Sequence, residues 1–197
     1  MAENLKYLPD VVGPATNSNT TSCYYVYGYD GTDVHTAKST ANYQTYGVLY
    51  NWPAAMNGAA TSNTIPSGVQ GACPAGWHLP SDAEWQQLEM YLGMSQAEAD
   101  NTGFRGTDEG GKMKHPGTEY WGSPNTGATN SSGLTALPGG LFYNGNFQGL
   151  NGEGHWWSST QYIEEVAWWR YFFYNVSKVS RGQVPKSSGL SVRCIKD

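Results

Sequence analysis

Charged residues are scarce in this sequence. Only 14% of its 197 residues are Asp, Glu, Lys or Arg, and acidic residues outnumber basic ones to give a formal net charge of −5. The chain therefore lacks the basic footprint of a nucleic-acid-binding protein and the polybasic patch of a membrane-surface protein. No apolar run approaches the roughly 20 residues of a membrane-spanning helix. No basic and apolar leader follows Met1. We therefore expect no nucleic-acid partner and no membrane insertion.

Cysteine and histidine are also few. The three cysteines (Cys23, Cys73 and Cys194) show none of the paired spacings of a zinc site, and the four histidines lie far apart along the chain. We therefore expect no bound metal and no cofactor. An odd number of cysteines allows one disulfide with one spare thiol, or three reduced thiols, and the residues alone leave both open.

Turn-forming and aromatic residues are abundant instead. The chain has 25 glycines, 14 tyrosines and 8 tryptophans. This composition is poor in helix formers and favours short strands and long loops, so we expect an α+β fold in one domain spanning residues 1–197. Abundant Tyr, Trp, Asn, Ser and Gly with little charge is also typical of recognition surfaces.

The clearest secondary-structure signal is a helix at residues 81–92. Ser81 and Glu84 have the spacing of a capping box, and Trp85 and Leu88 fall on one helical face. The stretches 29–40, 59–72 and 102–154 read as turns and loops, the last with short strands at 134–137 and 141–143. The other expected elements are helices at 53–58 and 95–103, strands at 4–8, 23–27 and 46–51, a tight hairpin at 143–147, and strands at 155–159, 167–175, 179–181 and 190–195.

Several ordered motifs resemble one known family. They are residues 73–85 (CPAGWHLPSDAEW), 156–160 (WWSST) and 189–197 (GLSVRCIKD), with further matches at 2–5, 46–52, 123–130 and 136–140. Over essentially its whole length, the chain is similar to the Fibrobacter succinogenes major paralogous domain. More remotely, the helix start and the Val-Arg-Cys ending resemble the formylglycine-generating-enzyme group, which has a C-type-lectin-like fold.

The resemblance implies that fold, with two helices flanking a twisted, mostly antiparallel sheet, and a place on the cell surface or outside the cell. It also implies a disulfide between Cys73 and Cys194, because C-type-lectin-like folds join these two elements. Many members carry a further cysteine before the Tyr-Gly motif. This chain has Tyr43 there, which leaves Cys23 without a partner.

An enzymatic activity does not follow from the resemblance. Formylglycine generation needs two nearby reactive cysteines, and Cys194 is the one cysteine in the last third of the chain. The Glu-Pro-Asn, Gln-Pro-Asp and Trp-Asn-Asp signatures of calcium-dependent sugar binding are absent from the sequence. We therefore expect a non-enzymatic binding module. The alternatives are a formylglycine-generating-type enzyme or pseudo-enzyme, and a purely structural module of a surface protein.

Residues 167–174 (AWWRYFFY) are aromatic on both faces of an expected strand. Alternation places Trp169, Tyr171 and Phe173 on one face, and the resemblance implies that the opposite face, with Trp168, Arg170 and Phe172, is core. Exposed aromatic residues in a row favour aggregation unless a partner covers them. We expect a binding patch for a glycan or a protein that joins these three aromatics to Ile163, Val176, Arg181, Gln183 and Val184. The alternative is that the loops at 102–154 cover this face and make it ordinary core.

The resemblance adds one variant of this hypothesis. Proteins diversified by retroelements use the same fold and vary residues in the last segment while the scaffold stays fixed. The polar and aromatic residues at 161–186 lie between the framework motifs at 156–159 and 191–194 and suit that design. A near-identical template copy beside the gene, differing at adenines, would establish this variant, and its absence would remove it.

Overall fold

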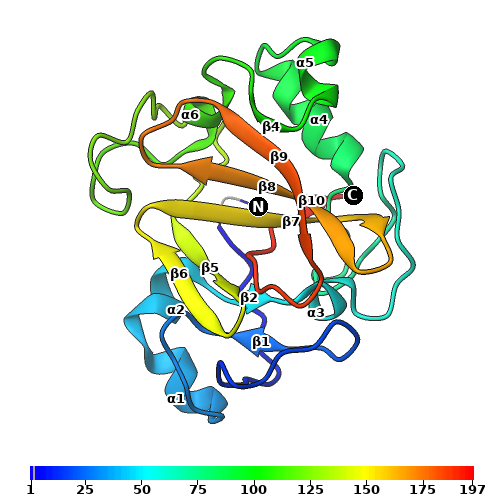
Figure 1. Cartoon of the computed structure of the whole chain (residues 1–197), viewed down its shortest axis with the longest axis vertical. Helices are drawn as coiled ribbons and strands as arrows, with labels where there is room; N and C mark the ends of the chain where they lie inside the picture. The colour runs from blue at the N-terminus through cyan, green and yellow to red at the C-terminus, as the bar shows by residue number, and fades with distance from the viewer. Residues whose placement is uncertain (2) are drawn as a thin grey trace.

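A six-stranded sheet forms the centre of the molecule (Figure 1). The structure is a computed structural model that describes Met1 and residues 3–197. The strands run in the order β4-β9-β8-β7-β5-β6, and neighbours pair antiparallel except for a parallel contact between β5 and β7. Their bounds are β4 Gly103–Arg105, β5 Gly139–Tyr143, β6 Asn146–Leu150, β7 Glu153–Ile163, β8 Val166–Phe173 and β9 Val179–Pro185.

Short helices and two small sheets surround this centre. β1 (Tyr24–Tyr25) pairs with β2 (Leu49–Tyr50), and β3 (Trp77–His78) pairs with β10 (Ile195–Lys196). In Figure 1, α4 and α5 lie beyond one end of the central sheet, and α1, α2 and the β1–β2 pair lie beyond the opposite end. The helices are α1 Val34–Ser39, α2 Ala41–Tyr46, α3 Trp52–Met56, α4 Asp82–Tyr91, α5 Gln96–Asp100 and α6 Glu109–Met113. The expected α+β class is confirmed.

In several places the structure contains the local features that the sequence predicts. At the start of α4 the Ser81 hydroxyl accepts the Glu84 N–H at 3.1 Å, and the Glu84 carboxylate accepts the Ser81 N–H at 2.9 Å, which completes the capping box. The turn between β5 and β6 places Asn144 and Gly145 at φ of 48° and 78°. Both values lie in the left-handed region that a tight hairpin of this kind requires.

Three other predictions are wrong. The expected strand at 4–8 has no regular structure, although the Leu5 N–H bonds the Val192 carbonyl at 2.9 Å. The loop expected at 29–40 contains α1, which Asp33 caps, and α2 follows directly with Thr40 as its cap. No apolar periodicity in the sequence marks either helix. Of residues 190–195, only Ile195 lies in a strand; Leu190 and Ser191 form isolated bridges, and residues 192–194 have no regular structure.

The two faces of the central sheet are buried against different clusters. Trp157, Ala167 and Val184 belong to the cluster that includes α3, while Trp156 and Phe172 face the cluster beneath α4. Successive side chains of β7 and β8 alternate between these clusters, as strand geometry requires. The predicted core role of Phe172 is confirmed, since it is fully buried.

A disulfide joins the segment before α4 to the last segment of the chain. Cys73 and Cys194 are bonded with an S–S distance of 2.04 Å, which confirms the expected pairing. Cys23 is buried as a free thiol. No helix within the described part of the chain is both long and apolar enough to cross a membrane.

Candidate ligand-binding groove

One face of the β7–β8 pair changes from core to surface along its length. The register places Trp157 opposite Trp169, His155 opposite Tyr171, and Glu153 opposite Phe173. Trp157 and His155 are buried, whereas Trp169, Tyr171 and Phe173 are half-buried. The three aromatics of β8 therefore lie where the α3-side cluster ends and solvent begins.

A buried imidazole supports two of these rings. The His155 ring lies with its centroid 4.6 Å from the rings of both Trp169 and Tyr171, and its plane is within 3° and 10° of theirs. The Trp169 and Tyr171 planes differ by 12°. The three nearly parallel rings therefore form one stacked group, in which His155 is buried and Trp169 and Tyr171 are half-exposed.

A carboxylate lies beside this ring pair. The Glu153 carboxylate accepts a hydrogen bond from His155 Nε2 at 3.1 Å, and the Tyr171 hydroxyl lies 3.5 Å from its other oxygen. The bond from His155 holds the pKa of Glu153 below its ordinary value. Burial lowers the pKa of His155, and its Nδ1 has no partner among the described residues. The pair is therefore an ionised carboxylate and a neutral imidazole.

A groove of about 380 Å³ opens over these rings. The β5–β6 hairpin forms one wall, and the end of β9 forms another. Its lining residues are Leu141, Tyr143, Gln148, Glu153, His155, Trp169, Tyr171, Gln183, Val184 and Pro185. The 102–154 region thus contributes a wall to this face and does not bury it. Beside the groove, Phe104 of β4 is 42% exposed and packs 5.4 Å from the Tyr171 ring.

The structure brings together part of the predicted patch. Trp169, Tyr171, Gln183 and Val184 line the groove, although Val184 is itself buried. Phe173 lies next to it, with its ring centroid 5.9 Å from that of Tyr171.

The other predicted patch residues lie elsewhere. Arg181 faces the opposite side of the sheet, where its guanidinium lies 3.8 Å from the Trp168 ring and pairs with Asp82. Ile163 is exposed at the end of β7, and Val176 sits in the turn after β8. These three residues do not join the groove.

Sequence reasoning missed the groove residues that come from other strands. Alternation backwards from Trp157 places His155 and Glu153 on the same face, so the sequence pattern alone could have indicated these two residues. The contributions of Phe104 and the β5–β6 hairpin depend on long-range pairing. Gly182 also has a role: a Cβ there would lie 2.8 Å from Trp169 Nε1, so glycine gives the indole its space.

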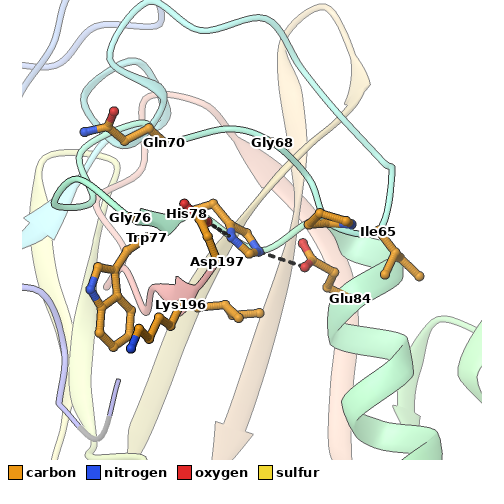
Figure 2. A pocket seen from close by; sticks show the side chains of 11 residues that line it. Ile65, Gly68, Gln70, Gly76, Trp77, His78, Glu84, Lys196 and Asp197 are labelled. Atoms are coloured by element: carbon orange, nitrogen blue, oxygen red, sulfur yellow. Dashed lines mark hydrogen bonds and ion pairs between the residues drawn. The ribbon is translucent and has the colours of Figure 1, made fainter.

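A second pocket, of about 450 Å³, lies between the 65–76 loop and β10 (Figure 2). His78 points between two carboxylates there, with Nδ1 2.7 Å from Asp197 and Nε2 2.8 Å from Glu84. Glu84 also accepts the N–H groups of Ser67 and Ser81. Two ionised carboxylates favour the imidazolium, in which both ring nitrogens donate, and these bonds tie the residue after β10 to α4.

This arrangement predicts a pH-dependent stability. Burial opposes the charged ring, but the hydrogen bonds to Asp197 and Glu84 prevail and raise the pKa of His78 above its ordinary value of 6.5. A raised folded-state pKa stabilises the protein below pH 6.5, and the stabilisation is lost as pH rises through the higher pKa. We expect His78→Gln to remove about 1–2 kcal/mol, mainly on the acidic side.

The measurement is urea unfolding across this pH range. His35 is exposed and offers a matched control, because His35→Gln should leave the pH profile unchanged. A wild-type profile that His78→Gln leaves unaltered would contradict the assignment of an imidazolium.

The comparisons with known proteins identify a family. The Fibrobacter succinogenes major domain profile matches residues 1–196, so the chain belongs to this family. A search of curated proteins and of solved structures finds no match. Within residues 1 and 3–197, no three His, Cys, Asp or Glu side chains are grouped so as to hold a metal ion.

Proposed function

We propose that this chain is a non-enzymatic, extracellular binding module that takes its ligand in the aromatic groove. The observation that carries the proposal is the half-exposed, nearly parallel pair of rings of Trp169 and Tyr171, backed by His155. Aromatic residues that are rigidly held and still accessible are typical anchors of binding sites. A ligand on these rings would also cover apolar surface that otherwise faces water.

The shape of the site favours a saccharide over a protein. The groove of about 380 Å³ is at the small end of ligand pockets and holds one or two sugar rings. Flat aromatic surfaces match the apolar face of a pyranose, which gains dispersion contacts there. Gln148 and Glu153 lie at the same groove and supply hydrogen-bonding groups for hydroxyls.

The same proposal includes a C-type-lectin-like fold. Its support is the disulfide between Cys73, just before α4, and Cys194 in the last segment, together with the antiparallel β7–β8–β9 sheet. Disulfides persist in oxidising compartments, which supports a location outside the cytoplasm.

The cysteines favour binding over formylglycine-type catalysis. That chemistry needs two nearby reactive thiols, and Cys194 is bonded to Cys73. Cys23 is buried, and burial raises the pKa of its thiol, which keeps it protonated and unreactive. No thiol pair is therefore present among the described residues.

The test is binding to a glycan array followed by calorimetry with the best oligosaccharide. Trp169→Ala and Tyr171→Ala should each weaken binding by about 30-fold, because each removes roughly 2 kcal/mol of anchoring contact. Circular dichroism should show that both variants keep their fold. Tyr162→Ala is the control, since Tyr162 is 54% exposed but lies near the β7–β8 turn, away from the groove lining.

Two results would count against the proposal. One is full binding by both groove variants, or a loss with Tyr162→Ala alone, because the ligand would then sit elsewhere. The other is no binding to any glycan or protein tested, which would favour a purely structural module.

A further inference from the structure

We infer that the ligand of the groove is a saccharide that carries a protonated amine, and that Glu153 binds this amine. The inference rests on the proposed function and refines it to one chemical class. It depends on a charge that the described residues leave without a counter-charge, next to aromatic rings that attract cations.

Among the described residues, the half-buried Glu153 carboxylate meets only neutral donors. Its side chain is 28% exposed, and its hydrogen-bond partners are the His155 imidazole and the Tyr171 hydroxyl. No Lys or Arg in the described residues forms an ion pair with it. His155 is buried, and its lowered pKa keeps it neutral, so the pair carries a net negative charge at neutral pH.

The rest of the groove adds no positive charge. Its lining contains aromatic, aliphatic and amide side chains besides Glu153 and His155, and no Lys or Arg. A neutral ligand that filled the groove could donate hydroxyl groups to the carboxylate but would bury it further without a counter-charge, which is unfavourable. A sulfated or carboxylated sugar would meet direct repulsion. A cationic ligand supplies the counter-charge.

The aromatic rings and the backbone reinforce this preference. A cation near the faces of Trp169 and Tyr171 is attracted by their π electrons, in addition to its attraction to the carboxylate. The carboxylate is also held in place: a side chain at Gly149 would collide with Glu153, and Gly149 has a φ of +74°. The β6 backbone therefore packs directly against the carboxylate and limits its movement.

An amino sugar fits these features better than a lysine side chain of a protein. On a pyranose, the amine is fixed to the ring that stacks on the aromatic pair, so both contacts form without ordering a flexible stem. The walled groove favours such a compact group over a flat protein surface.

The experiment compares two oligosaccharides of the same backbone, one with free amines that carry charge and one with neutral acetamides. A hexamer of glucosamine and a hexamer of N-acetylglucosamine are titrated into the protein by calorimetry, at a pH below the pKa of the amines and above that of Glu153. We expect the glucosamine hexamer to bind roughly tenfold more tightly, the size of one charge-assisted hydrogen bond. Glu153→Gln should remove this preference, so that the glucosamine hexamer loses roughly tenfold more affinity than the N-acetylated hexamer does.

The control is Glu164→Gln, which removes an exposed carboxylate on the β7–β8 turn and should keep the preference. Added salt should reduce the preference in the wild type, because it screens the charge interaction.

The outcomes separate this inference from the proposed function. Equal binding of both hexamers, or a preference that Glu153→Gln leaves intact, would overturn the amine inference. Loss of binding in Tyr171→Ala would still support ligand binding in the groove. Binding of a lysine-rich peptide in place of both hexamers would overturn the assignment of a saccharide as the ligand. Failure of every saccharide and protein to bind would overturn both proposals.

Discussion

Replacing Glu89 with methionine should lower the free energy of unfolding by about 3–5 kcal/mol, more than replacing Arg170 does. Glu89 is fully buried and pairs with two arginines: its carboxylate lies 2.6 Å from Arg170 Nε and 2.5 Å from Arg105 Nη2. Asp82 in turn pairs with Arg170 at 2.6 Å and with Arg181 at 2.7 Å. These five side chains form one buried cluster between α4 and the sheet.

The net charge that each substitution leaves in the cluster explains why Glu89→Met should destabilise the protein more than Arg170→Met does. Three arginines and two carboxylates give the cluster a net charge of +1. Removing Arg170 leaves a neutral set in which Asp82 keeps Arg181 and Glu89 keeps Arg105. Removing Glu89 leaves a charge of +2, with Arg105 left without a carboxylate. A buried charge without a partner costs more than the lost attraction itself.

The measurement is urea unfolding of the wild type, Glu89→Met, Arg170→Met and the double variant, with the disulfide kept oxidised. The double variant should be less destabilised than the sum of the single changes, because the two residues share an ion pair. A loss with Arg170→Met equal to or larger than that with Glu89→Met would contradict the charge argument.

Only part of this cluster could be predicted from the sequence. Alternation along β8 correctly places Arg170 on the face of Phe172. Its partners could not be predicted, because Asp82 and Glu89 lie 88 and 81 residues away in the chain. The register between β8 and β9 places Arg181 opposite Arg170, which is why it pairs with Asp82 and does not reach the groove.

Features determined by neighbouring residues were predicted more successfully. The capping box at Ser81, the Asn-Gly turn and the two faces of β8 depend on contacts within a few residues. The groove does not: His155, Gln148 and the β5–β6 wall meet the β8 aromatics through pairing between distant strands. The helices α1 and α2 are an intermediate case. Their capping residues can be recognised in the sequence, but no apolar face indicates a helix.

The second large effect is expected from removing the disulfide. Cys73 and Cys194 are 121 residues apart, and closing a loop of this length stabilises a protein by about 4–5 kcal/mol in the chain-entropy model. We expect Cys73→Ser/Cys194→Ser to lose most of this free energy of unfolding. The double variant is preferable to either single one, because a lone partner thiol could pair with Cys23 when the chain unfolds.

The matched control is Cys23→Ser. Cys23 is buried, and its thiol donates a weak hydrogen bond to the Thr21 carbonyl at 3.6 Å, so its loss should cost little beside that of the disulfide. Dithiothreitol should shift the urea midpoint of the wild type and of Cys23→Ser, and leave that of the double variant unchanged. A double variant as stable as the oxidised wild type would show that packing around β3 and β10 holds the two segments together without the covalent bond.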